Sequence, residues 1–287
     1  MTFVLNDTPP ALADRLAELR RRLQEAGSIL VAFSGGADSA FLLAAAARAL
    51  GPDQVVAATA VSSSLPASEL ADAEAFAAEL GVRHEAVATD EMSRDGYRAN
   101  AGDRCYFCKA ELLDVLGPVA ERLGLATVAT GTNADDAIAG FRPGIRAAAE
   151  RGASTPLRDA GFSKDDVRTA SRLWELRTWD KPAAACLSSR IAFGIQITPG
   201  RLARVENAEA TLRARMHEAG LPVRNLRVRD LGDDGARVEV DAELVEQLAA
   251  RPDLLEAVDG FAQITVDPRG FRSGSMNEML ADAGKYR

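Results

Sequence analysis

Residues 29–39 read ILVAFSGGADS and determine how the first half of the chain is expected to fold. The apolar run from Ile29 to Phe33 predicts a buried strand. The glycine turn that follows leads into an alanine- and leucine-rich helix that reaches about Leu50. A strand, a glycine turn and a helix are the first unit of a parallel α/β sheet. Such a turn exposes backbone N–H groups at a helix N-terminus, where an anion binds.

The sequence on both sides of this stretch repeats the alternation of strands and helices. Apolar positions at helical spacing precede it and end at Gly27. Strand patterns and helix patterns follow along the chain: strands at 54–61, 82–87 and 127–130, and helices at 66–80 and 163–175. The glycine and proline content of residues 141–157 predicts a loop. The alternation predicts a parallel sheet with helices on both faces, whose ligands bind at the carboxyl ends of the strands.

From Pro199 onward the pattern changes to that of a smaller α+β domain. It contains a helix and predicted strands at 226–230, 236–240 and 262–266. We therefore place a boundary between Gly194 and Gly200 and expect two domains, residues 1–195 and 196–287.

Composition excludes several classes of protein. The 287 residues include 34 Lys plus Arg against 42 Asp plus Glu, and the net charge of −8 argues against nucleic-acid binding. No leader-like start or stretch of membrane-spanning length is present, so we expect no membrane partner and a cytoplasmic location. The three cysteines cannot all pair within one chain, and we interpret them as reduced thiols.

The glycine turn has the residues of a phosphate-binding loop. Glycines allow a close approach of phosphate to the backbone at Ser34, Gly35 and Gly36, and Ser39 adds a hydroxyl group. Asp38 can orient the loop or help to hold Mg²⁺. The Gly-Lys-Ser/Thr ending of a Walker A loop is missing. An ordinary turn with a helix cap is the alternative, but its place between a buried strand and a helix resembles the PP-loop of the adenylating ATP pyrophosphatases.

The PP-loop resemblance implies further nucleotide contacts. It implies that the loop holds the pyrophosphate leaving group of ATP, and that adenine packs beside residues 58–62, which include Ala60. The later turn GTNADD, from Gly131, would position phosphates and Mg²⁺ through Asp135. The alternative for this turn is a helix cap by Asn133 with acids in the first turn.

The cysteines lie in two blocks. Cys105 and Cys108 occur in RCYFCK, near an expected helix start, where two thiolates can bind one metal or cluster, form a redox pair, or be unrelated buried thiols. Cys186 occurs in KPAAACLSSR, where Lys181 and Arg190 could lower its pKa and make it a nucleophile. A small core residue is the alternative. Three cysteines fit an iron–sulfur cluster with one open iron better than a zinc site.

Several other side chains are candidates for binding or packing. Arg227 and Arg229 alternate onto one face of a strand, where they could clamp a phosphate or face solvent. Glu239 and Asp241 also share a strand face, and we expect them to face water rather than bind a metal. Tryptophan side chains at the end of the 163–175 helix are expected to pack: Trp174 and Trp179.

Taken together, SGGADS, RCYFCK, GTNADD, the Arg-Pro-Gly segment and KPAAACLSSR resemble the LarE family, the sulfur transferases of nickel-pincer cofactor synthesis. The blocks cover most of residues 25–195. The resemblance implies that ATP adenylates a carboxylate of pyridinium-3,5-biscarboxylic acid mononucleotide, and that sulfur then replaces the activated oxygen. It also implies that the arginine pair holds the substrate phosphate and that the chain forms a closed multimer such as a hexamer. Ser189 and Arg190 are candidate catalytic residues because they lie close after Cys186 in the sequence.

The family has two branches that differ in the source of sulfur. In one, a cysteine matching Cys186 gives up its own sulfur and becomes dehydroalanine. In the other, three cysteines hold a [4Fe-4S] cluster, and we favour this branch because Cys105, Cys108 and Cys186 account for its ligands. Rival functions are tRNA thiolation, disfavoured by the net charge of −8, and ammonia-dependent adenylation or simple nucleotide binding, which leave the cysteines unexplained.

Overall fold

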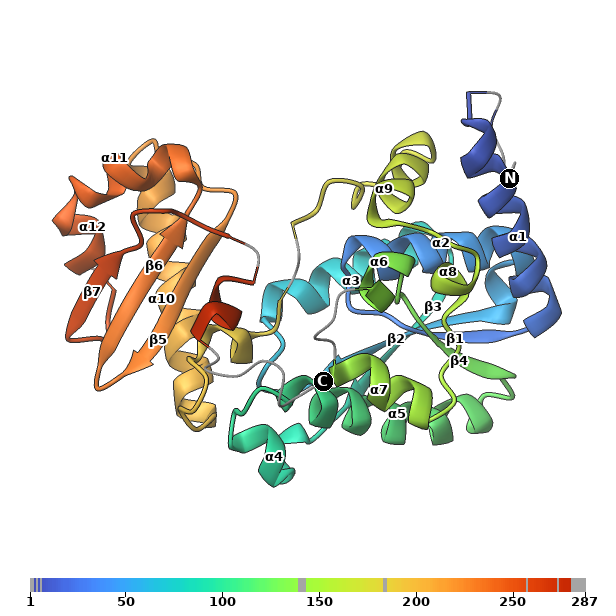
Figure 1. Ribbon diagram of the computed structural model, residues 1–287, viewed down its shortest axis with the longest axis horizontal. Coiled ribbons are helices and arrows are strands. Elements are labelled where there is room, and N and C mark those ends of the chain that lie inside the picture. Colours follow the sequence, from blue (N-terminus) through green and yellow to red (C-terminus); the bar gives the residue numbers. More distant parts are fainter. Residues whose placement is uncertain are drawn as a thin grey trace. The chain divides into compact units, whose positions relative to one another are not determined.

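The computed structural model describes residues 3, 5, 7–138, 143–182, 185–256, 258–272 and 274–279, and the chain divides into two compact units (Figure 1). The first unit comprises residues 1–91 and 105–184, and the second comprises residues 92–104 and 185–286. The predicted domains, residues 1–195 and 196–287, are segments expected to fold independently. Compactness does not test independent folding, so this division stays a prediction.

The first unit is built on a parallel four-stranded sheet with the strand order β3-β2-β1-β4. Its strands are β1 (Ile29–Ala32), β2 (Val55–Val61), β3 (Arg83–Ala88) and β4 (Thr127–Thr130). The chain leaves β1 toward β2 and β3 and later returns to the other side of β1 with β4. The direction of the topology therefore switches between β1 and β4, and ligands bind at the carboxyl ends of strands at such a point.

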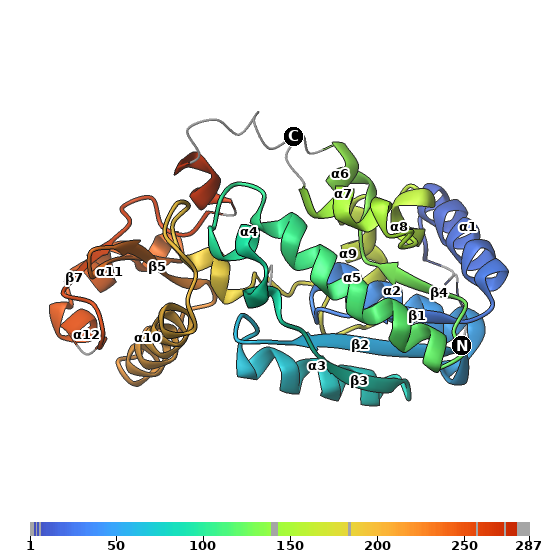
Figure 2. The same cartoon turned by 90° about the horizontal axis from the view of Figure 1, so that it is seen from below.

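Helices cover both faces of this sheet, as the views in Figures 1 and 2 agree. Alternate residues of β1 point to opposite faces: Ile29 and Val31 join the larger apolar cluster, whereas Leu30 and Ala32 pack with Leu116 of α5. The fold is thus the predicted α/β fold of the PP-loop type. Its helices are α1 (Pro10–Ala26), α2 (Ala37–Leu50), α3 (Ala67–Glu79), α5 (Arg104–Arg122), α6 (Ala134–Ile138), α7 (Pro143–Glu150), α8 (Pro156–Asp159) and α9 (Lys164–Leu173), with the 3-10 turns η1 (Pro52–Gln54) and η2 (Glu91–Ser93).

The loop predicted over residues 141–157 is wrong for most of its length, because α7 and the start of α8 lie there. Each helix has proline at its first position, where proline favours a helix start. Ala147 and Ala148 are buried, so tertiary packing stabilises a helix that the glycine and proline content disfavours. Residues 141 and 142 lie outside the described residues, as do 183 and 184 of the Cys186 block.

The second unit contains a three-stranded sheet in the order β5-β6-β7, antiparallel between β5 and β6 and parallel between β6 and β7. Its strands are β5 (Leu226–Gly232), β6 (Gly235–Val240) and β7 (Gln263–Val266). Apolar side chains on one sheet face pack on Leu212 and Met216 of the long helix α10. Its helical segments are α4 (Asp95–Arg98), α10 (Pro199–Glu218), α11 (Val245–Ala249) and α12 (Pro252–Glu256), with η3 (Leu187–Arg190), η4 (Ala242–Leu244) and η5 (Ser275–Met279).

None of the helices in the described part of the chain combines the length and apolar composition needed to cross a bilayer.

Candidate functional site

The glycine turn lies between β1 and α2, as predicted, and its backbone is shaped for an anion. Gly35 has a φ of 71°, a conformation that glycine adopts without strain, and Gly36 is the N-cap residue of α2. The hydroxyl oxygens of Ser34 and Ser39 lie 3.1 Å apart, and the Ser39 hydroxyl donates to the Gly36 carbonyl at 3.1 Å. These contacts fix the turn while the first backbone N–H groups of α2 remain at its N-terminus.

Gly131 brings the end of β4 directly against the first turn of α2. A Cβ atom on Gly131 would lie 2.8 Å from the backbone N of Ser39 and 3.0 Å from the carbonyl carbon of Asp38. Backbone atoms cannot give way as a flexible side chain can, so this position requires glycine. The close approach places the GTNADD turn beside the glycine turn.

Asp136 interacts electrostatically with Asp38 near this contact, and it was not among the predicted site residues. Burial raises the pKa of Asp38, and the negative charge of Asp136 raises it further, whereas the nearby Asn133 side chain acts in the opposite direction. Asp135, the predicted magnesium ligand, accepts a hydrogen bond from the backbone N of Lys164 at 2.8 Å through one carboxylate oxygen, and its role as a ligand stays a prediction. Asp136 is therefore the acid that interacts with Asp38.

The donor set at Asp38 and Asp136 fits Mg²⁺ in chemistry. Two nearby carboxylates whose charges repel each other are stabilised by a divalent cation, and Mg²⁺ often takes one or two protein carboxylates together with substrate phosphates. Among the described residues, no group of three or more His, Cys, Asp or Glu side chains is arranged to hold a metal ion, so an ion at Asp38 and Asp136 would need further ligands such as phosphate oxygens.

Asn133 caps the helix α6, as the alternative interpretation of the GTNADD turn expects, because its side-chain oxygen accepts the backbone N–H of Asp136 at 3.0 Å. The role of this turn in binding phosphates and Mg²⁺ stays a prediction.

The carboxyl end of β2, where adenine was expected, is held by a buried glutamate. Ala60 is half-buried near the end of the strand. Beyond it, the hydroxyl groups of Ser62 and Ser64 donate to one carboxylate oxygen of Glu91 at 2.5 and 2.6 Å. Glu91 is 3% exposed, so its buried carboxylate holds the turn after β2 in place. Nothing in the sequence pattern indicated Glu91, since Ser62 and Ser64 lie more than 25 residues before it in the chain.

Cys105 and Cys108 lie in the first turn of α5, as predicted, where a spacing of three residues puts both thiols on one helix face. Cys105 is exposed and Cys108 is half-buried. Gly144 of α7 packs beside them, since a Cβ atom there would lie 3.4 Å from the carbonyl oxygen of Cys105. Both thiols belong to the first unit, whereas Cys186 belongs to the second.

Cys186 directly precedes the 3-10 turn η3 and is half-buried. Ser189 donates to the Cys186 carbonyl oxygen from both its hydroxyl, at 2.8 Å, and its backbone N, at 3.0 Å. Arg190 donates from Nη1 to the same oxygen at 3.0 Å. The contacts of these two predicted catalytic residues therefore shape the backbone at Cys186, and their roles in chemistry stay predictions.

Arg190 is held in place by Glu209 of α10. Glu209 was not among the predicted site residues. The guanidinium group donates to the two carboxylate oxygens of Glu209 at 2.9 and 3.1 Å, and Arg190 is 4% exposed. Glu209 also accepts the backbone N–H of Val228 in β5 at 3.0 Å. A single half-buried carboxylate thus links the Cys186 turn to α10 and to β5.

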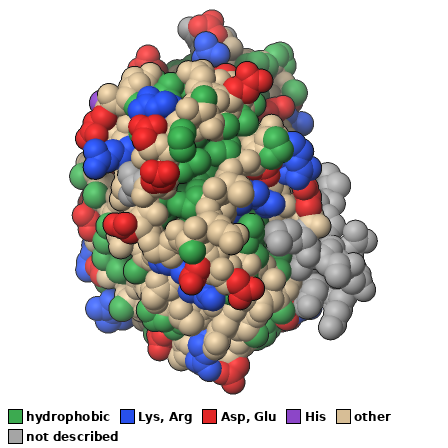
Figure 3. All heavy atoms as spheres, turned by 90° about the vertical axis from the view of Figure 1, so that its left-hand side faces the viewer, with side chains coloured by type: hydrophobic (Ala, Val, Ile, Leu, Met, Phe, Trp, Pro, Cys, Tyr) green, Lys and Arg blue, Asp and Glu red, His purple; other side chains and the backbone are tan. Residues whose placement is uncertain are grey.

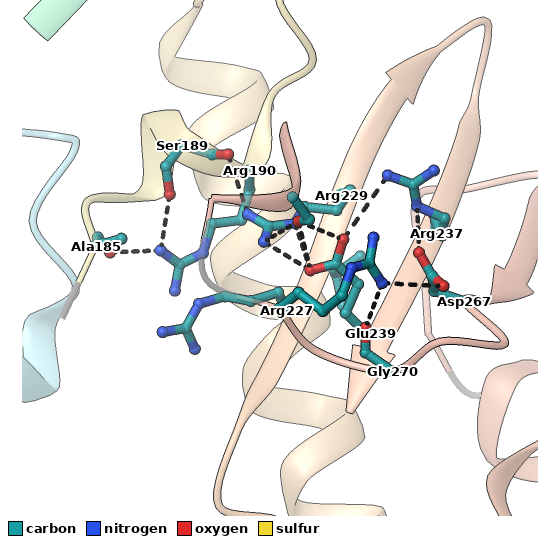
Figure 4. A network of polar contacts seen from close by, with 12 residues as sticks. Ala185, Ser189, Arg190, Arg227, Arg229, Arg237, Glu239, Asp267 and Gly270 are labelled. Carbon is teal, nitrogen blue, oxygen red and sulfur yellow. Dashed lines mark hydrogen bonds and ion pairs between the residues drawn. The ribbon is translucent and has the colours of Figure 1, made fainter. Parts of the chain in front are cut away.

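Arg227 and Arg229 lie on one face of β5, beside Glu239 of β6 (Figure 4). Both arginines are buried, and Arg229 donates to one oxygen of Glu239 at 3.1 and 2.7 Å. Our expectation that Glu239 faces water is wrong, because its side chain is fully buried. Arg229 also donates to the Ser189 carbonyl at 3.1 Å, which connects this cluster to the turn after Cys186.

The arginine cluster has an excess of positive charge in a buried setting. Burial lowers the pKa of Arg227 to about 10, and the positive charge of Arg190 acts in the same direction. Its guanidinium group lies over the ring of Phe271, 5.2 Å from the centroid. An anion bound here would offset the repulsion among these cations, and arginine forks match phosphate oxygens.

A second buried cluster ties residues 92–104 to the segment after Cys186. The Asn100 side-chain amide donates to the carbonyl oxygens of Ala192 and Ile195 at 2.8 and 2.9 Å. Arg104, the residue before Cys105, donates to the carbonyl of Ser188 at 2.8 Å, and Tyr97 hydrogen-bonds the Ser188 hydroxyl. No local sequence pattern indicates this cluster, since the contacts that cross it join residues 84 to 95 positions apart.

The predicted packing of the two tryptophans holds for Trp174, which is 7% exposed within the apolar cluster, whereas Trp179 is 38% exposed. Asp241 caps a loop by accepting the backbone N–H groups of Arg224 and Asn225 at 2.7 and 3.0 Å.

On the face of the second unit drawn in Figure 3, acidic and basic side chains are interspersed. That face shows no broad basic region of the kind that binds nucleic acid.

Two matches with known proteins identify the protein class and then the family of this chain. Residues 12–103, which include the glycine turn, match the NAD synthase family. The chain is 34% identical over 275 residues to the pyridinium-3,5-bisthiocarboxylic acid mononucleotide synthase of Lactiplantibacillus plantarum, covering 95% of this chain and 97% of that protein. The chain belongs to the family of that synthase, the LarE family.

Two relatives of unassigned function also match. An uncharacterized protein of Synechocystis sp. is 43% identical over 274 residues, covering 94% of this chain and 99% of that protein. An uncharacterized protein of Methanocaldococcus jannaschii is 28% identical over 176 residues, 61% of this chain and 66% of that protein.

Proposed function

We propose that this protein is an ATP-dependent sulfur transferase that converts a carboxylate of pyridinium-3,5-biscarboxylic acid mononucleotide into a thiocarboxylate. The observation that carries the proposal is the glycine turn at the carboxyl end of β1, against which Gly131 packs so closely that no side chain fits. Family membership supplies the substrate class, since the relative from L. plantarum is named for the bisthiocarboxylic acid product.

The first unit binds ATP in this proposal. The backbone N–H groups of the turn and the hydroxyls of Ser34 and Ser39 bind the β- and γ-phosphates. Asp38 and Asp136 hold Mg²⁺ between them and the phosphates, and Asp135 keeps the neighbouring loop in place. Adenine packs near Ala60, where Glu91 orders the turn after β2.

The reaction has two steps. A substrate carboxylate oxygen attacks the α-phosphorus of ATP, and the bond to the bridging oxygen breaks, so that pyrophosphate leaves and an acyl adenylate forms. A sulfur nucleophile then attacks the acyl carbon, the carbon–oxygen bond to AMP breaks, and AMP leaves with the electron pair. The second step needs no oxidant or reductant when the sulfur arrives as sulfide.

The second unit binds the mononucleotide phosphate in this proposal. Arg227 offers a buried charge that its neighbours destabilise, and phosphate would neutralise it. Arg229 is held by Glu239 and by the Ser189 carbonyl, so it aligns the cluster with the turn after Cys186.

We assign the sulfur step to a [4Fe-4S] cluster bound by Cys105, Cys108 and Cys186, which would supply sulfide at its open iron. Two observations support a fit: the thiols of Cys105 and Cys108 share one helix face, and Arg104 donates to the Ser188 carbonyl at 2.8 Å. The second contact holds the residue before Cys105 close to the segment that follows Cys186. Thiolate ligands also favour the reducing cytoplasm as the place where the enzyme works.

Anaerobic purification followed by turnover counting tests the cluster assignment. We expect about four iron atoms and a similar amount of sulfide per chain, and many thiocarboxylates per chain when sulfide is supplied. Cys105→Ser should lose most of the iron but keep ATP binding, because Cys105 is exposed and outside the glycine turn.

The alternative is sacrifice of the Cys186 sulfur. An iron-free protein that forms a single product per chain, with loss of the elements of H₂S from Cys186, would select that route and contradict the cluster.

A further inference from the structure

Lys181 and Glu69 form an ion pair directly beside the glycine turn. The Lys181 Nζ lies 2.7 Å from a carboxylate oxygen of Glu69 and 3.4 Å from one of Asp72. A Cβ atom on Gly35 would lie 3.8 Å from both the Lys181 Nζ and the same Glu69 oxygen. The two charged groups therefore lie close to the Gly35 position of the turn that we assign to the phosphates.

The surroundings strengthen this pair relative to an ordinary surface pair. The side chains of Lys181 and Glu69 are 19% and 23% exposed, so solvent screens their charges only in part. Glu69 lies in the first turn of α3, whose N-terminus favours its negative charge.

Anchoring of the segment before Lys181 does not require this pair. Arg177 already holds that segment to α3, donating to the Asp72 carbonyl oxygen at 2.8 Å and to Glu79, the last residue of the helix, at 3.2 Å. The Lys181 ammonium is thus available for a different task beside Gly35.

The carboxylate of Glu69 lies next to a proposed anion site, where its negative charge is unfavourable unless a cation offsets it. Glu69 alone would repel a pyrophosphate on the turn, whereas a lysine between them attracts the anion and neutralises the carboxylate. An ammonium group has three donors on a flexible stem, so one lysine can donate to Glu69 and to a phosphate oxygen together.

We propose that Lys181 is a phosphate-binding residue that donates to the pyrophosphate leaving group on the glycine turn, and that Glu69 holds the ammonium in place and limits how tightly the product binds. The inference rests on the proposed ATP-dependent function and adds one binding residue and one opposing residue to it. Because the leaving pyrophosphate must depart after each turnover, a competing carboxylate favours its release.

Calorimetric titration with magnesium pyrophosphate tests the assignment on the full chain. Lys181→Met should weaken binding about 10- to 100-fold, since a charge-assisted hydrogen bond is lost. Glu69→Gln should tighten binding several-fold, because the ammonium loses its competitor and the repulsion disappears. Arg177→Gln is the matched control, which removes a cation from the same segment at the far end of α3 and should leave the affinity unchanged.

The opposite signs distinguish binding from a structural role. If the pair only anchored the segment, Lys181→Met and Glu69→Gln would change the affinity in the same direction, together with Arg177→Gln, or not at all. Either result overturns the assignment. Failure of the wild-type chain to bind magnesium pyrophosphate would overturn the proposed function as well, whereas equal binding by all four proteins overturns only the role of Lys181.

Discussion

Asp38 lies in surroundings that disfavour its negative charge. Burial and the nearby Asp136 raise the pKa of Asp38 above its ordinary value. A carboxyl group with a raised folded-state pKa favours the neutral form, so the ionised group destabilises the fold at pH values above that pKa. Groups that bind ligands often carry such a penalty, which a cation here would offset.

Asp38→Asn should therefore stabilise the ligand-free protein at pH 7, while it removes binding of Mg²⁺-ATP. The gain should shrink as the pH falls toward about 4, the unfolded-state pKa of aspartate, because the wild-type carboxyl group then becomes neutral. Urea unfolding at several pH values measures both effects. A variant less stable than the wild type at pH 7 would contradict this account of Asp38.

Asp135→Asn provides the comparison at the neighbouring position. Asp135 accepts the Lys164 backbone N–H at 2.8 Å without interacting with Asp38 as Asp136 does. That substitution should leave stability the same or lower it.

The contact of β4 with α2 is the element-scale feature on which the nucleotide site depends. The strand ends at Thr130, and Gly131 then lies against the backbone of the first helical turn. Any side chain there must push the N-terminus of α2 away from β4, and the anion-binding N–H groups move with it.

Gly131→Ala should destabilise the protein by about 1–3 kcal/mol, the usual range for overpacking, and weaken ATP binding at the same time. Chemical unfolding and ATP titration measure the two losses. Gly117→Ala is the control, since Gly117 lies inside α5 with open space at its Cβ position, and alanine there should be neutral or slightly stabilising. Equal effects of the two substitutions would show that the close approach has no special role.

Elements with strong local patterns could be predicted from the sequence. The buried strand from Ile29 and the glycine turn after it follow from an apolar run and a turn signal. Helix α7 could not be predicted, because its stability comes from burial of Ala147 and Ala148 by distant elements. The same reason hid Glu209, Glu91 and Asn100, whose partners lie far away in the sequence.

The charged face of β5 and β6 shows more clearly what sequence alternation cannot predict. Alternation placed Arg227 and Arg229 on one face, but it could not tell a solvated face from a buried one. The structure buries Glu239 between the arginines and Ser275, which donates to it at 2.9 Å. Burial of a charged face is a property of the tertiary structure. The sequence therefore indicated which residue types form the site, but it could not indicate that they are buried.

At the scale of the whole molecule, the proposed function assigns ATP to the first unit and the substrate phosphate to the second. The three cysteines are divided between the units, with Cys186 in the second. Segment 92–104 belongs to the second unit although it is flanked by parts of the first, and its Arg104 directly precedes Cys105. The closed multimer implied by the family resemblance stays a prediction.

Pyrophosphate release, measured under anaerobic conditions with ATP, Mg²⁺ and sulfide, tests the central claim most directly. We predict that pyrophosphate and AMP appear only when pyridinium-3,5-biscarboxylic acid mononucleotide is present, and that one pyrophosphate forms for each thiocarboxylate. Release of ADP and phosphate, or pyrophosphate release that is the same without the mononucleotide, would contradict the assignment of the glycine turn to adenylation.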